Sequence, residues 1–185
     1  MSNIDIKLEP LTEEHLEMIR NWRQLEEVTK YMYTDPKISK EQQIEWFKLV
    51  SKDPTKKFFI ISFQGKPLGL CSVTDINYAF KKCSWAFYIG DTSIRGQGIG
   101  SKVEYNVLNY VFYELNLNKL NCEVFVSNDP VIKMHEKFGF RREAYFRNHV
   151  FKYNKFHDVV GLAMLKDEWE KLKITMYNKI YKNKN

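Results

Sequence analysis

The stretch Ile94-Arg95-Gly96-Gln97-Gly98-Ile99-Gly100-Ser101 places three glycines between two predicted elements. Residues 83–89 form an apolar run that predicts a strand, and residues 101–115 carry apolar side chains at helical spacing. The glycines therefore lie at the N-terminus of a predicted helix. There the first N–H groups have no intrahelical partner and the helix dipole is positive, so a phosphate group can dock on bare backbone. We expect an anion site at this loop.

A glycine loop of this kind also occurs in ordinary strand-to-helix turns and in several phosphate-binding classes. A nucleotide P-loop ends in Gly-Lys-Ser/Thr, whereas this loop ends in Gly98-Ile99-Gly100-Ser101. A dinucleotide-binding fold needs a second βαβ unit and an acidic residue about twenty positions on. The candidate acid, Glu123, arrives late and in the middle of a predicted strand. The surrounding sequence must therefore decide the class of the loop.

A second segment, residues 121–140, predicts a strand, a short helix and a closing glycine. Asp129 suits the N-cap of this helix, Pro130 its first turn and Gly139 the residue after it. Together with the loop Arg95–Gly100, this segment resembles the GNAT family of N-acetyltransferases. The resemblance implies an α/β (α+β) fold with a mixed, mostly antiparallel central sheet flanked by helices. It also implies acetyl-coenzyme A as co-substrate and a primary amine as acceptor.

Length and composition predict one domain. A chain of 185 residues with 44% hydrophobic and 15% aromatic content can bury a sizeable core. We expect residues 1–185 to form a single acetyltransferase domain with acceptor-side helices in 1–57, an acetyl-coenzyme A-binding core in 83–140 and a terminal hairpin and helix in 141–185. Thr12 and the Ser39-to-Gln42 capping box predict helix starts, and Asn154-Lys155 predicts the hairpin turn.

The resemblance assigns the cofactor contacts mainly to backbone groups. The strand before the loop binds the pantetheine arm as an edge strand binds an extended peptide, and the neighbouring strands diverge after a bulge to admit the acetyl end. Asn128 reaches the same cofactor. The expected cofactor-binding residues are Phe87, Tyr88, Ile89, Arg95, Gly96, Gln97, Gly98, Ile99, Gly100, Ser101 and Asn128.

Acetyl transfer to an amine needs a base for the amine and a proton for the departing thiolate. The resemblance implies that Glu123, in the apolar strand 120–126, is the base; the alternative is a half-exposed surface glutamate. His135 stands where the family usually has a tyrosine, the proton donor to the coenzyme A sulfur. Its alternative is a half-buried helix residue bonded to backbone, with Tyr88 or Tyr145 as donor instead.

Within the first fifty residues, the segments Ile19-Arg20-Asn21-Trp22-Arg23, Tyr31-Met32-Tyr33 and Gln42-Gln43-Ile44-Glu45-Trp46-Phe47, together with Val28 and Ile38, carry a second resemblance. They are similar to the N-terminal segment of the sugar-nucleotide acetyltransferases of pseudaminic acid biosynthesis. Those enzymes acetylate the 4-amino group of a UDP-linked 4-amino-4,6-dideoxy sugar. The resemblance implies substrate binding by Trp22, Arg23 and Trp46, because arginine pairs with a diphosphate and aromatic rings stack on uracil or sugar. The alternative is that both tryptophans are core and that Arg23 pairs with Glu26 or Glu27.

The sequence leaves two other functions open. A related enzyme would acylate a protein N-terminus, with a ribosomal protein as the expected target. A catalytically weak, coenzyme A-binding regulatory module would retain the loop without turnover. An acceptor groove for a peptide would be open and acidic, whereas a UDP-sugar site would cluster arginine and aromatic side chains.

Composition bears on partners and location. The net charge of +6 comes from dispersed lysines and arginines, so we expect no nucleic-acid partner. No run of about 18 apolar residues and no signal-peptide core is seen, so we expect a cytoplasmic protein without membrane contact. Cys71, Cys83 and Cys122 predict reduced thiols, and the four histidines lack ligand spacing, so no metal is expected. We expect a monomer or a homodimer.

Overall fold

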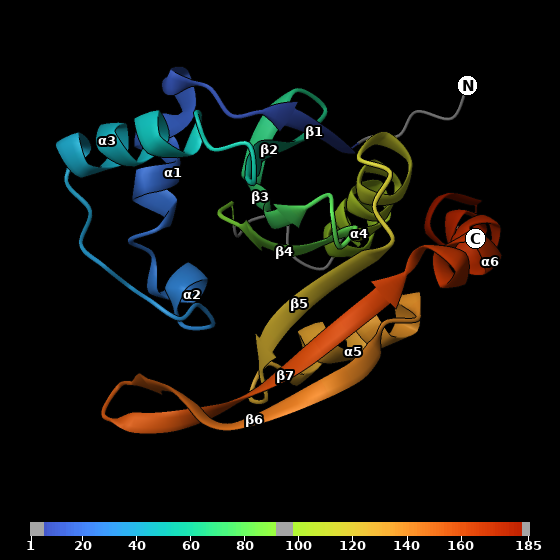
Figure 1. Ribbon diagram of the computed structural model, residues 1–185. Helices are drawn as coiled ribbons and strands as arrows, with labels where there is room; N and C mark the ends of the chain where they lie inside the picture. Colours follow the sequence, from blue (N-terminus) through green and yellow to red (C-terminus); the bar gives the residue numbers. More distant parts are fainter. Residues whose placement is uncertain (1–5, 92–97, 183–185) are drawn as a thin grey trace.

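The computed structural model describes residues 6–91 and 98–182. Its centre is one seven-stranded sheet in the order β1-β2-β3-β4-β5-β7-β6 (Figure 1). All neighbouring strands are antiparallel except β4 and β5, which are parallel. The mixed, mostly antiparallel sheet is therefore confirmed. The strands are β1 (Ile6–Pro10), β2 (Lys57–Phe63), β3 (Lys66–Asn77), β4 (Lys82–Ile89), β5 (Lys119–Phe125), β6 (Arg141–Lys152) and β7 (Lys155–Leu165).

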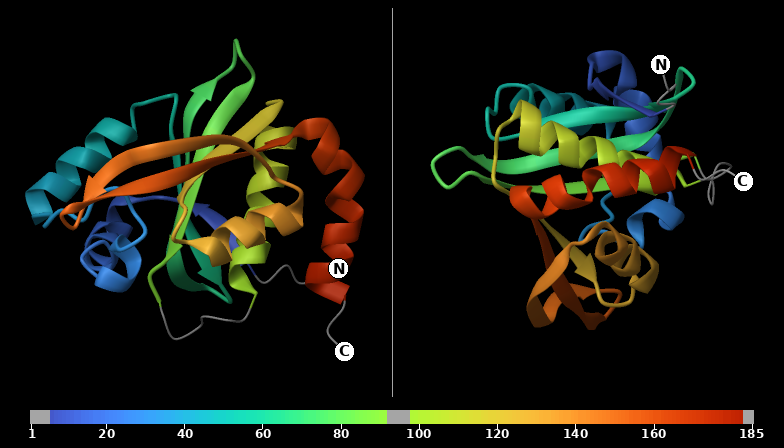
Figure 2. Two further views of the ribbon diagram at one scale, coloured as in Figure 1. Left: turned by 90° about the horizontal axis from the view of Figure 1, so that it is seen from below. Right: turned by 90° about the vertical axis from the view of Figure 1, so that its right-hand side faces the viewer.

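Helices cover both faces of the sheet, and each face has its own core. On β2 and β3, Ile60 and Leu70 pack toward α1 and α3, whereas Ile61 and Cys71 belong to the larger core with α4, α5 and α6. This alternation follows from the two-residue period of a strand. Figure 2 shows α4 and α6 side by side on the larger core. The helices are α1 (Leu16–Trp22), α2 (Glu26–Thr29), α3 (Lys40–Val50), α4 (Ile99–Asn109), α5 (Asp129–Phe138) and α6 (Lys166–Tyr177).

Most of the predicted helix-capping residues lie at the helix ends where they were expected. Ser39 accepts a hydrogen bond from the Gln42 backbone N–H at 3.2 Å, and the Gln42 side chain accepts one from the Ser39 N–H at 2.8 Å. Gly139 ends α5 in the left-handed conformation, with φ of 100°. One cap differs from the prediction, because Asn128 is the N-cap of α5 and Asp129 is its first helical residue. The first-turn position still suits an aspartate, which faces the positive end of the helix dipole.

The terminal hairpin turns one residue earlier than predicted. Tyr153 and Asn154 both have positive φ, 52° and 56°, and Lys152 pairs directly with Lys155. A two-residue turn with two left-handed residues matches the twist of the flanking strands. The tip of this hairpin reaches back toward α2 (Figure 1).

The sheet divides in the middle, between β4 and β5. The parallel pairing joins only Lys82–Ser84 to Lys119–Asn121, and the Asn121 amide donates to the Ser84 hydroxyl at 2.9 Å at the last paired position. Beyond this point β4 pairs with β3 alone and β5 with β7 alone. The expected divergence is confirmed, although the irregularity nearby lies in β3, between Thr74 and Asn77. The gap leaves one backbone edge of each strand free to bind another molecule.

Candidate active site

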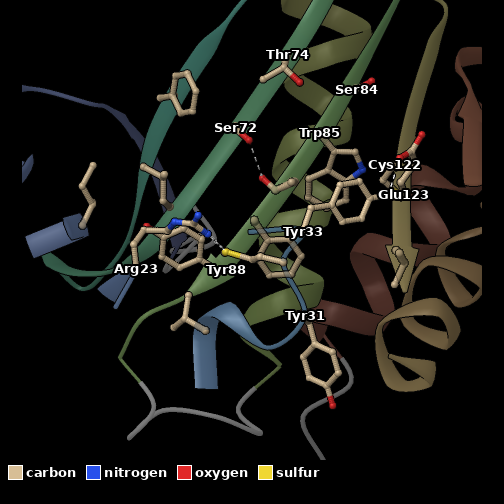
Figure 3. A pocket seen from close by; sticks show the side chains of 18 of the residues that line it. Arg23, Tyr31, Tyr33, Ser72, Thr74, Ser84, Trp85, Tyr88, Cys122 and Glu123 are labelled. Carbon is tan, nitrogen blue, oxygen red and sulfur yellow. Dashed lines mark hydrogen bonds between the residues drawn. The ribbon is translucent and has the colours of Figure 1, made fainter. Parts of the chain in front are cut away.

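A cavity of about 1120 Å³ opens where β4 and β5 separate. Its walls come from β2, β3, the end of β4, the middle of β5, α5 and the N-terminal segment 19–46. Figure 3 shows Arg23 beside Tyr88 at one side of this cavity and Glu123 on its strand at the other. The cavity therefore joins the predicted cofactor strand to the predicted acceptor segment.

The cofactor side of the cavity contains the strand that the sequence predicted. Phe87, Tyr88 and Ile89 line it, and β5 leaves their backbone unpaired on one side. An extended pantetheine arm fits such an edge, because its amides can take the place of a missing strand. Asn128 also lines the cavity, from the N-terminus of α5.

The glycine loop continues this side into the N-terminus of α4. Gly98 caps the helix with φ of 72°, and a Cβ built there would meet nothing within 4 Å. The first turn of α4 has no acidic residue, so the positive helix end and the open glycine surface suit a phosphate. Ile99 is buried in the core and Ser101 lies in the first turn. The other predicted loop residues, Arg95, Gly96 and Gln97, lie outside the described residues.

Gly100 has a packing role that the sequence did not indicate. A Cβ at this position would lie 3.0 Å from the Met134 sulfur and 3.6 Å from the Phe87 ring. This glycine therefore lets α4 approach α5 and β4 closely. Gly98 and Gly100 thus differ, since only the first faces open space.

Glu123 projects from β5 into the cavity, on the face opposite to Cys122. Its side chain is 43% exposed. The Tyr33 hydroxyl donates a hydrogen bond to Glu123 Oε2 at 2.6 Å, and His149 Nε2 lies 4.0 Å from the same oxygen. Burial and this hydrogen bond raise the pKa of Tyr33, so its hydroxyl remains protonated and donates. The carboxylate is thus oriented and still accessible.

Two distant segments bring Tyr33 and His149 to Glu123. Near the hairpin tip the buried Lys152 donates to the Thr29 and Met32 carbonyls, both at 2.7 Å, which fixes the chain before Tyr33. A register shift in β6 between Phe146 and Val150 includes His149, whose ring contacts Tyr33. Sequence reasoning did not find these residues, because 90 positions separate Tyr33 from Glu123 and no local motif joins them.

His135, in the second half of α5, also lines the cavity and is 3% exposed. Its ring packs against Trp85 and Phe140, and its Nδ1 is 2.8 Å from Glu104 Oε1. The structure therefore gives this imidazole a carboxylate partner in place of the backbone bond considered above. Among the other predicted donors, Tyr145 donates to Asp158 on the hairpin, while Tyr88 lines the cavity.

The predicted acceptor residues have different positions. Arg23 lines the cavity, and no described carboxylate lies within ion-pair distance of it, so pairing with Glu26 or Glu27 is not found. Trp46 lines the cavity and also packs on Phe58. Trp22 is not part of the cavity wall; it packs in the smaller core, where its indole occupies the space that a Cβ at Gly90 would need. Core packing therefore accounts for Trp22.

Comparison with known proteins adds the family. Residues 5–141 match the model of the acetyltransferase (GNAT) domain. The chain belongs to the GNAT family. It is therefore an N-acetyltransferase with a single GNAT domain, and acetyl-coenzyme A is its co-substrate.

Two relatives and one solved structure show what the chain is similar to. Spermidine N(1)-acetyltransferase of Escherichia coli (strain K12) is 23% identical over 89% of this chain and 88% of its own length. Acetyltransferase PseH of Campylobacter jejuni (serotype O:23/36, strain 81-176) is 25% identical over 73% of this chain and 84% of its own. The structure of spermidine N-acetyltransferase from Vibrio cholerae with CoA and spermine superposes with a TM-score of 0.86, 23% identity and coverage of 91% and 99%.

Two further properties concern the described residues alone. No group of three histidine, cysteine, aspartate or glutamate side chains among them is arranged to hold a metal ion. None of the helices in 6–91 and 98–182 has the length and apolar character needed to cross a membrane.

The two glycines of the loop predict separable effects. Gly98→Val adds a β-branched side chain on the open surface at positive φ. The strained backbone should cost roughly 1–2 kcal/mol of stability. Because the side chain also blocks the approach of a phosphate to the backbone, we expect calorimetric titration to show coenzyme A affinity lowered by about tenfold. Gly100→Val instead meets Met134, so we expect a lower melting temperature.

Gly65→Val is the matched control, since Gly65 also has positive φ, 78°, and open space but lies in the β2–β3 turn. It should lose stability much as Gly98→Val does and bind coenzyme A normally. Wild-type affinity in a folded Gly98→Val variant would remove this glycine from the pyrophosphate site.

Proposed function

We propose that the acceptor is a primary amine carried by an anionic molecule, and specifically the 4-amino group of a UDP-linked 4-amino-4,6-dideoxy sugar. The observation that carries this proposal is the charge of the acceptor wall. Within segment 19–46, the described cavity-lining residues include three cations, Arg23, Lys30 and Lys37, and one anion, Glu27, while the two other acidic residues of the lining, Asp75 and Glu123, lie on β3 and β5. A diphosphate is attracted to such a wall, whereas a polyamine is repelled.

Polar and aromatic groups near Arg23 support the same acceptor. Desolvation lowers the pKa of Arg23, so a diphosphate beside it would interact more strongly than at an exposed arginine. The hydroxyl of Tyr88 is buried next to this site and has no hydrogen-bond partner in the described part of the chain. Tyr31 and Trp46 offer ring surfaces for a base or a sugar. The match to PseH is consistent with this choice.

The two walls suit the two proton transfers of the reaction. Glu123, oriented by Tyr33, accepts the proton of the amine directly or through water. His135 donates a proton to the thiolate that departs from the acetyl group, in the role implied by its position in α5. Acetyl-coenzyme A supplies the activated acyl group. The amine then attacks the thioester carbonyl without an acyl-enzyme.

A polyamine is the second candidate acceptor, because spermidine acetyltransferases align over most of the chain. A protein N-terminus is the third. A catalytically weak regulatory module would bind coenzyme A and acetylate none of them. The three acceptor classes differ in charge, so a direct comparison of their rates separates them.

Glu123→Gln should lower turnover about a hundredfold, because glutamine keeps the size of the side chain but cannot take the amine proton. Acetyl-coenzyme A affinity should stay unchanged, and raising the pH should recover part of the rate, since more of the amine is then neutral. Glu143→Gln makes the same change on an exposed part of β6 and should have no effect. Wild-type turnover in Glu123→Gln at neutral pH would make Glu123 structural.

The acceptor is tested by mass-detected acetylation of a panel of UDP-amino sugars, polyamines and N-terminal peptides. We expect the UDP-amino sugar to have the highest kcat/KM. Arg23→Ala should then raise its KM by about tenfold or more, from a charge-assisted hydrogen bond of roughly 1.5–3 kcal/mol. Arg142→Ala makes the same charge change on the exposed hairpin and is the control.

Acetylation of polyamines or peptides with no UDP sugar accepted would overturn the proposed acceptor. Coenzyme A binding without turnover on any amine would favour the regulatory module.

A further inference from the structure

Glu104 is a carboxylate in a place where carboxylates are costly. It lies in α4 among Val103, Val107 and Leu108, and its relative exposure is 0%. An ionised group in such surroundings needs a partner, because removal from water costs several kcal/mol. Its hydrogen-bond partner within the described residues is His135 of α5, with Oε1 2.8 Å from Nδ1, while Oε2 has none. The Glu104 carboxylate thus forms its hydrogen bond with one imidazole nitrogen, Nδ1 of His135.

We infer that Glu104 is a positioning residue that keeps a hydrogen on His135 Nε2, so that His135 can protonate the departing thiolate. This inference rests on the proposed role of His135 as proton donor. It concerns a residue that does not line the cavity and that would act through the imidazole. The pair joins α4, which follows the glycine loop, to the cavity wall formed by α5.

The hydrogen bond determines where the protons of the pair lie. Burial raises the pKa of Glu104. Burial alone lowers the pKa of His135, but its hydrogen bonds to Cys122 and Glu104 outweigh this effect and raise the pKa to about 10. Because Oε1 and Nδ1 are 2.8 Å apart, the pair holds one proton between these two atoms. Whether that proton is nearer the oxygen or the nitrogen, the second nitrogen, Nε2, carries a hydrogen.

The same arrangement allows Nε2 to give its proton away. When the Nε2 proton moves to the thiolate sulfur, the shared proton settles on Nδ1 and Glu104 remains as an ionised acceptor. The imidazole is then neutral, and no imidazolate forms. The protons balance, since Glu123 takes one from the amine, His135 gives one to the sulfur, and exchange with solvent restores both groups.

Other groups around His135 do not supply this function. In the described part of the chain, Trp85 and Phe140 contribute apolar ring contacts, and Cys122 of β5 is the second titratable group that contacts the imidazole, through a side-chain hydrogen bond. Cys122 lies on the cavity side of His135, whereas Glu104 lies behind it in the core. Glu104 is therefore the group that holds Nδ1.

The test is Glu104→Gln, which keeps shape but cannot store the proton. With acetyl-coenzyme A and any amine that the wild type accepts, we expect kcat to fall by about 10- to 100-fold, with KM and coenzyme A affinity near wild type. The loss should be much smaller with the acetyl thioester of 4-nitrothiophenol, because its thiolate leaves without a proton. Glu136→Gln on the exposed face of α5 is the matched control.

The pH profile gives an independent readout. Glu104 raises the pKa of His135, so its removal lowers that pKa, and protonated His135 is then lost at lower pH. The descending limb of kcat should move to lower pH in Glu104→Gln, with partial recovery of activity in acid. An unshifted limb, or an equal loss with both thioesters, would show that Glu104 only holds α4 against α5.

A third readout needs neither turnover nor the variant. In ¹⁵N-imidazole NMR of the wild type, His135 should have a protonated Nε2 at neutral pH. A bare Nε2 would overturn the inference even if the enzyme is active. If the wild type acetylates no amine, the proposed function fails, while this spectrum still decides the role of Glu104.

Discussion

The site depends on the end of hydrogen bonding between β4 and β5 after Ser84 and Asn121. A parallel pair that continued would fill the sheet and leave no cavity. Because the pairing stops, the second half of β4 has backbone N–H and C=O groups without a strand partner on one side. Such groups need hydrogen-bond partners from another molecule. We propose that the pantetheine arm of acetyl-coenzyme A is that partner. The cavity is therefore a consequence of strand pairing rather than of loop shape.

The two-residue period of β5 then places neighbouring side chains on opposite faces of the strand. Cys122 faces His135 and the core, and Glu123 faces the acceptor segment and Tyr33. A shift of register by one residue would exchange these faces. The register is held by the antiparallel pairing of β5 with β7, in which Glu123 lies opposite Gly161. β5 thus carries Glu123, the proposed base, and α5 carries His135, the proposed acid.

Several elements were predictable because local signals specify them. The strand before the loop, the Ser39 capping box and the left-handed Gly139 each depend on residues within a few positions. The cap at Asn128 was missed by one residue, since Asn128 and Asp129 are both good N-caps. From the sequence we expect a phosphate contact at Gly100. The packing of Met134 on this glycine was not predictable, because only the fold brings the two residues together.

The partners of the proposed catalytic residues were not predictable in the same way. Tyr33 and Lys152 act through contacts across 90 and 120 positions of the chain. Glu104 did carry a signal, because it falls at helical spacing from Val107 and Leu108, on the apolar face of its helix. A carboxylate on such a face indicates a buried partner, although only the fold identifies it as His135.

The most direct test of the central claim is a crystal structure with coenzyme A bound. We expect the pantetheine amides to hydrogen-bond to the backbone of Phe87–Ile89, with the sulfur in the cavity between Glu123 and His135. A bound coenzyme A that leaves the free edge of β4 unoccupied, or that places its sulfur outside this cavity, would contradict it.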